Sequence, residues 1–144
     1  MQHKIKNAPL KIAALALSLF SIQAVADISV IVHPGNAVYL NKDDVARLFL
    51  GKQHSFKDGS VAVPVDQNEG SEIRDQFYVE LVNKNASQLK SWWARLIFTG
   101  KGSPPRAVGT NDNVVLLVGS NPNMIGYVDS EKVDKSVRVV LTLD

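Results

Sequence analysis

The sequence predicts an α/β domain in which a mainly parallel sheet is flanked by helices. Short β-branched runs alternate along the chain with segments that carry helix caps and helical apolar spacing. Of the 144 residues, 45% are apolar and 21% are charged, which is typical of a globular domain and not of a disordered chain. The length leaves room for one domain, and a chain without cysteine forms neither disulfides nor thiolate sites.

The N-terminus has the three parts of an export signal. Three lysines within the first 11 residues precede an apolar stretch at 12–22, and Ala24-Val25-Ala26 places small residues where a signal peptidase cleaves. The apolar stretch is shorter than the ~20 residues that span a bilayer. An amphipathic first helix is the alternative, but the stretch is apolar nearly all round. We therefore expect a signal peptide at 1–26, a periplasmic domain at 27–144, and no membrane span after cleavage.

Charge and motifs argue against a nucleic-acid binder and against an enzyme. Without the first three lysines, 13 basic residues face 14 acidic ones, so the domain itself is not basic. There is no G-x-S-x-G motif, and Gly100-Lys101-Gly102-Ser103 lacks the spacing of a P-loop. His33 and His54 are too far apart in sequence for a helical ligand pair and are more typical of surface or turn residues. We expect no catalytic residues, no metal, no cofactor and no nucleic-acid partner.

The first half of the domain is predicted to form a strand, a helix and a second strand. A β-branched strand at 28–32 ends at His33-Pro34-Gly35-Asn36. Asn41 is a helix N-cap with Asp44 as its capping-box partner, and the helix ends at Gly51. Asp43 and Asp44 resemble paired catalytic carboxylates, but in a first turn they more often complement the helix dipole. The second strand, 61–65, contains a proline, which favours an edge or a strand start.

The second half is predicted to contain three helices and two strands. The helices begin at Ser71, Ser87 and Asn111, the second ending at Gly100, and the strands cover 124–128 and 137–143. The third helix is apolar on every side at 114–118, which predicts burial. Trp92 and Trp93 could stack on a sugar or a base, but core packing of one of them, with the other partly exposed, is the more typical reading. The expected core residues are Val45, Leu48, Phe49, Phe77, Leu81, Leu96, Ile97, Val115 and Val118.

The segment 66–71 is the candidate binding site, because it leaves a strand and enters a helix. The first amide groups of such a helix have no partners within it and can bind an anion. Ligands of open α/β sheets also gather at the carboxyl ends of strands. The alternative is that Ser71 only caps its own helix. The candidate anion-binding residues are Gly70, Ser71, Gln67, Asn68, Glu72, Arg74 and, on the neighbouring strand end, Asn36.

An ordered set of motifs resembles the periplasmic phosphate-binding proteins of ABC transporters. The segment from Asp43 to Lys52 resembles that family's helix followed by the residues IFLGK. The remaining motifs follow in the family's order: Asp58-Gly59, Gly70-Ser71, Phe77, Gly100-Lys101-Gly102 and Ile125-Gly126-Tyr127-Val128. The resemblance spans 28–128 and is nearest to the short substrate-binding-like proteins of little more than one lobe. It implies a single lobe of the type 2 periplasmic-binding fold, and an oxyanion bound and delivered to an ABC permease without chemistry.

The resemblance also implies how this site differs from the family's phosphate loop. Gly70 and Ser71 match the central Gly-Ser, whereas Gln67 stands where the family has arginine, Glu72 where it has glycine and Ile73 where it has threonine. We expect weak, salt-sensitive binding of phosphate or a related oxyanion, and a lobe that pairs with a second copy or another protein. The alternative is an exported interaction module with a decayed anion site.

Overall fold

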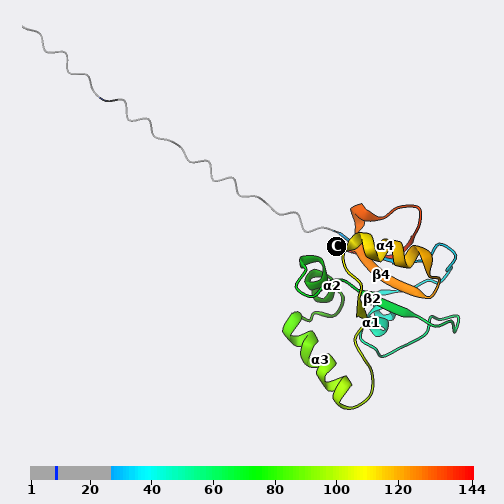
Figure 1. The fold of residues 1–144 in the computed structure, drawn as a ribbon, viewed down its shortest axis with the longest axis horizontal. Coiled ribbons are helices and arrows are strands. Elements are labelled where there is room, and N and C mark those ends of the chain that lie inside the picture. Colours follow the sequence, from blue (N-terminus) through cyan, green and yellow to red (C-terminus); the bar gives the residue numbers. More distant parts are fainter. Residues whose placement is uncertain (1–8, 10–26) are drawn as a thin grey trace, which may run out of the picture.

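The computed structural model describes Pro9 and residues 27–144. The predicted signal peptide, apart from Pro9, therefore lies outside the described residues. The elements along the chain, of which the α-helices and two of the strands are labelled in Figure 1, are β1 (Ile28–Val32), α1 (Lys42–Phe49), β2 (Val63–Asp66), α2 (Glu72–Val82), α3 (Ala86–Phe98), β3 (Arg106–Ala107), α4 (Asn111–Ser120), β4 (Met124–Asp129), η1 (Ser130–Lys132) and β5 (Arg138–Leu143).

The strands form one mixed sheet in the order β3-β2-β4-β1-β5. β2 runs parallel to β3 and β4, whereas β1 lies between β4 and β5 and runs antiparallel to both. The α/β class is confirmed, but the sheet is not mainly parallel as expected. A β-branched run predicts a strand without its direction, and here the pairing partners of β1 decide that direction.

The two faces of the sheet are covered by different helices. Ile28, Val30 and Val32 of β1 pack with α1, α2 and α3 in the larger hydrophobic cluster. Ile31, on the other face, packs with Val65 and with α4 in the smaller cluster. α4 can approach the sheet closely because Gly126 has no side chain. A Cβ at this position would lie only 2.5 Å from a methyl group of Val114. Both helix layers therefore depend on the two-residue alternation of the strands.

Local capping signals determine most helix ends. Asn41 and Asp44 form the predicted capping box of α1, and Gly51 follows with a φ of +72°. α3 has a second capping box, between Asn85 and Gln88, so it begins at Ala86 and not at Ser87 as expected. α4 is capped by Thr110, so Asn111 is its first helical residue and not its cap.

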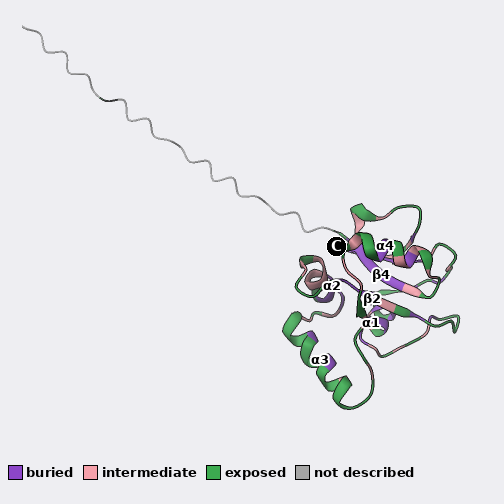
Figure 2. Cartoon of the chain, viewed as in Figure 1, coloured by how far each residue is buried: buried purple, intermediate pink, exposed green. Residues whose placement is uncertain are grey.

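The predicted core is confirmed except at the outer part of α3 (Figure 2). Trp93 is buried and Trp92 is half-buried, as expected for adjacent positions on a helix. Leu96 is only half-buried, and Ile97 is 56% exposed because the last turn of α3 extends beyond the sheet. α4 is likewise not buried all round, since Leu116 is 68% exposed. Among the described residues, no helix is long and apolar enough to cross a membrane.

Candidate anion-binding site

The turn from β2 to α2 presents the N-terminus of a helix at one end of the sheet. Gly70 has a φ of +83°, a conformation that glycine adopts without strain, and the Ser71 amide donates to the Asn68 carbonyl at 3.2 Å. The first helical hydrogen bond runs from the Asp75 amide to the Ser71 carbonyl. The amides of Glu72 to Arg74 therefore precede it and point out of the helix end, where they can meet an anion.

The Ser71 side chain does not cap α2. Ser71 occupies the N-cap position with extended backbone, but its hydroxyl makes no capping hydrogen bond. Its Oγ is buried and has no hydrogen-bond partner within the described part of the chain. Buried polar atoms are normally paired, so an unpaired hydroxyl beside outward-pointing amides needs an explanation other than capping.

The Gln67 side chain points away from this helix end and forms hydrogen bonds to β4 and α4. The residue is 2% exposed, and its Nε2 donates to the Asn111 side chain and to the Tyr127 carbonyl, both at 2.9 Å. Asn111 also accepts the Asp129 amide at 3.0 Å. Both amide hydrogens of Gln67 are therefore used to join β2, β4 and α4. The prediction that Gln67 donates to a ligand does not agree with this packing.

Arg74 is held by a buried carboxylate. Its Nε lies 3.3 Å from Oδ2 of Asp66, the last residue of β2, and its side chain is 15% exposed. The Tyr78 hydroxyl donates to the same Oδ2 at 2.8 Å, while Oδ1 accepts from the Tyr127 hydroxyl and from the Gln67 amide. Asp66 is thus saturated with donors, and its negative charge faces the guanidinium that was expected to serve as a counter-charge for a ligand.

The titration of this cluster follows from its burial and from the Asp66 charge. Burial, and then the Asp66 carboxylate, raise the pKa of both Tyr78 and Tyr127, so both hydroxyls stay protonated as donors. Burial, the largest single influence, lowers the pKa of Arg74, but the charge of Asp66, its hydrogen bond to Arg74 and the nearby Tyr78 and Tyr127 together outweigh burial and leave this pKa raised. At neutral pH, the guanidinium of Arg74 is therefore charged and both tyrosine hydroxyls are neutral.

Asn36 lies at the opposite end of the sheet from Gly70. β1 runs antiparallel to β4, which pairs Val32 with Ile125, whereas β2 runs parallel to β4 and pairs Pro64 with the same residue. The end of β1 is therefore beside the beginning of β2. Asn36 instead accepts the Val38 amide through its side chain and the Arg138 guanidinium through its carbonyl. The expectation of a shared rim is wrong, because it assumed parallel strands.

The remaining predicted residues surround the helix end, but two carboxylates come with them. Asn68, Gly70 and Glu72 are exposed, as is Glu69 between them. Like charges near a bound anion reduce its affinity. The structure thus brings together Gly70, Ser71, Asn68, Glu72 and Arg74 and separates Gln67 and Asn36 from the surface that they would form.

Sequence reasoning missed the side chains that hold this helix end in place. Asp66, Tyr78 and Tyr127 converge from β2, α2 and β4. A charged residue at the end of an apolar strand, with a basic residue eight positions later, was the available signal for Asp66. Tyr78 and Tyr127 carried no such signal, and Asn111 was predicted to be a helix cap.

No family model matches the sequence, and no curated protein matches it. Among solved structures, the chain is similar to a Clostridium perfringens protein described as a phosphate ABC transporter substrate-binding protein and solved with bound phosphate. The two share 27% identity and a TM-score of 0.64, over 80% of this chain and 45% of that one. An ABC-type phosphate transport receptor from Vibrio cholerae shares 17% identity and a TM-score of 0.61, over 80% of this chain and 46% of the receptor. PstS from Borrelia burgdorferi shares 14% identity and a TM-score of 0.59, over 80% of this chain and 47% of PstS.

These similarities define the class of the fold. The chain has a periplasmic-binding-protein fold, and its structural neighbours are phosphate ABC transporter substrate-binding proteins. The resemblance found in the sequence is therefore confirmed. The chain spans about half the length of each of these structures.

Proposed function

We propose that the protein is an exported, non-enzymatic solute-binding protein that binds phosphate or a related oxyanion at the N-terminus of α2. The observation that carries this proposal is the buried Ser71 hydroxyl, which has no partner among the described residues and lies beside outward-pointing amides. A tetrahedral oxyanion would accept hydrogen bonds from the Ser71 hydroxyl and from these amides. The likeness to a phosphate-containing structure supports the same ligand class.

The surroundings of the site predict weak binding. Arg74 is neutralised by Asp66, and Glu69 and Glu72 are exposed beside the helix end. An oxyanion would therefore depend on neutral donors and on the partial charge of the helix, which salt screens readily. One lobe also leaves the ligand open to solvent. A second lobe, from another copy or from another protein, would close over it before delivery to an ABC permease.

Isothermal titration of the mature protein with phosphate, sulfate and glycerol tests the proposal. We expect heat with the two anions, none with glycerol, and weaker binding as salt is added. Ser71→Ala should weaken binding because it removes the unpaired hydroxyl. Gly70→Val should abolish binding, because valine is strained at a φ of +83° and would displace the turn.

The matched control is Gly59→Val. Gly59 has nearly the same conformation, with a φ of +86°, and open space at its Cβ, but it lies in the loop before β2. The Gly59→Val substitution introduces a similar backbone strain away from the site and should leave anion binding unchanged. Unchanged binding in Gly70→Val, or equal losses in both variants, would place the site elsewhere.

An exported interaction module on the same fold is the second candidate. Phe98 is 92% exposed at the end of α3, next to Ile97, and such residues are common at protein interfaces. Absence of heat in every anion titration would favour this function.

A further inference from the structure

A concave site lies near the beginning of β2, away from Gly70. Its volume is about 390 Å³, within the range of small-molecule sites. The end of α1, the start of β2, Trp93 of α3 and the loop 100–105 enclose it. We call it the α3 pocket.

The α3 pocket combines apolar walls with positive charge. Its apolar lining comes from Leu48, Ala62, Val63, Pro64, Trp93, Pro104 and Pro105. Lys101 and Arg106 also line it, and none of the acidic residues that the structure describes does. Neither cation takes part in the ion pairs found among the described residues, which involve Arg47, Lys57 and Arg74. Two unneutralised cations beside an apolar surface favour an anion that also carries an apolar group.

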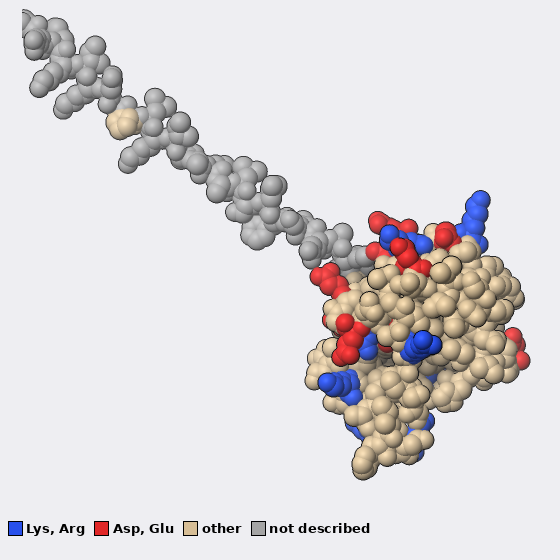
Figure 3. Space-filling view, in the orientation of Figure 1, with Lys and Arg blue, Asp and Glu red and all other residues tan. Residues whose placement is uncertain are grey.

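The charge of the surrounding segment reinforces this preference. Residues 81–111 contain five lysines and arginines and no acidic residue, so all 14 carboxylates lie elsewhere in the chain. Figure 3 shows blue and tan without red over the lower part of the molecule, where α3 lies in Figure 1. Such a one-sided distribution attracts anions over a distance of several ångströms.

The pocket suits a small molecule better than an extended peptide. Pro64, Pro104 and Pro105 have no amide hydrogen, so three positions of its wall cannot pair with an added strand. Their rings, together with the Trp93 indole, form flat apolar surfaces. We infer that the α3 pocket binds a small organic anion with an apolar ring or chain. This site is independent of the oxyanion site at α2.

Amide and indole NMR shifts of the full domain, titrated with three probes, test the inference. Phenyl phosphate has both the ring and the charge, inorganic phosphate only the charge, and benzyl alcohol only the ring. We expect phenyl phosphate to shift the Trp93 indole and Gly102 amide signals at lower concentration than either other probe. Lys101→Gln and Arg106→Gln should each raise its Kd by about five-fold, which corresponds to ~1 kcal/mol.

Lys90→Gln is the matched control, since it removes the same charge from α3 at a residue that does not line the pocket. It should leave the Kd nearly unchanged. Equal shifts with benzyl alcohol, an equal loss in Lys90→Gln, or tighter binding of a tetraglutamate peptide would each overturn the inference. Loss of phenyl phosphate binding in Gly70→Val would also overturn it, because the probe would then occupy the α2 site, and the proposed function would stand.

Discussion

The Nε atom of Arg74 lies 3.3 Å from Oδ2 of Asp66, which ties the first turn of α2 to the last residue of β2. The guanidinium nearest the candidate site is therefore committed to a buried carboxylate. This contact holds the helix end in place and leaves the helix amides and Ser71 as the donors of the proposed oxyanion site.

Asp66→Asn should destabilise the protein by about 3 kcal/mol or more, because it leaves the largely buried Arg74 without its counter-charge. The same variant should bind phosphate more tightly, since the released guanidinium can attract the anion. Denaturant melts and titration calorimetry measure the two effects. Asp112→Asn, an exposed carboxylate on α4, should change stability by less than about 0.5 kcal/mol. Stability equal to that of the wild type would show that the pair contributes nothing.

Phe77→Ala should cost about 3–5 kcal/mol of unfolding free energy. Phe77 is fully buried, stacks on Tyr127 with ring centroids 3.7 Å apart, and meets Phe49 edge-on at 4.9 Å. Urea unfolding followed by circular dichroism measures the loss. Val79→Ala, on the same helix but 46% exposed, should change it by far less. A loss below about 1 kcal/mol for Phe77→Ala would contradict its place in the core.

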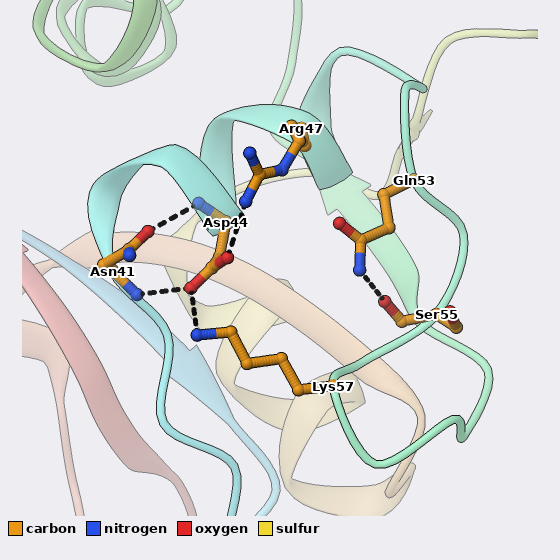
Figure 4. A network of polar contacts seen from close by, with 6 residues as sticks. All are labelled: Asn41, Asp44, Arg47, Gln53, Ser55 and Lys57. Carbon is orange, nitrogen blue, oxygen red and sulfur yellow. Dashed lines mark hydrogen bonds and ion pairs between the residues drawn. The ribbon is translucent and has the colours of Figure 1, made fainter.

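Asp44→Asn should lower stability at neutral pH by about 1 kcal/mol and progressively less in acid. Figure 4 shows the Asp44 carboxylate accepting from Lys57, from the Asn41 amide and from Arg47. The Lys57 contact, followed by the Asn41 amide, lowers the pKa of Asp44 below its ordinary 3.8. A lowered pKa in the folded state stabilises the protein above the unfolded value, and this contribution disappears as the pH falls through the folded value.

Thermal melts of wild type and Asp44→Asn from pH 7 to pH 2 measure that difference. Asp43→Asn, in the same helical turn but exposed and outside these ion pairs, is the control and should show a smaller change. A difference for Asp44→Asn that stays constant down to pH 2 would contradict the assignment.

The exported protein should begin at Asp27, because the small residues at Ala24 and Ala26 fit signal peptidase cleavage. Intact mass of protein recovered from the periplasm measures this directly. Ala26→Arg should block cleavage and leave the longer chain. Recovery of the full 15.7 kDa chain from the cytoplasm of wild-type cells would contradict the prediction.

Local signals in the sequence predicted the elements whose formation depends on neighbouring residues. These signals are the capping box of Asn41 and Asp44, the left-handed glycine at 51 and the β-branched run of β1. Each acts within a few residues, so its effect is the same in many tertiary contexts. The turn at Gly70 and Ser71 is also among the features predicted from local signals, because the conformation of a strand-to-helix turn depends on neighbouring residues.

Only the tertiary structure decided which side chains reach the candidate site. The direction of β1 is set by pairing with β4 and β5, and that direction moves Asn36 to the far end of the sheet. Gln67 points inward because Asn111 and the Tyr127 carbonyl, 44 and 60 residues away along the chain, supply its hydrogen bonds. Arg74 is neutralised by Asp66 across a turn, and Ile97 is exposed because, among the described residues, no other element covers the last turn of α3. Contacts between distant segments depend on the whole packed arrangement, so no local pattern could determine them.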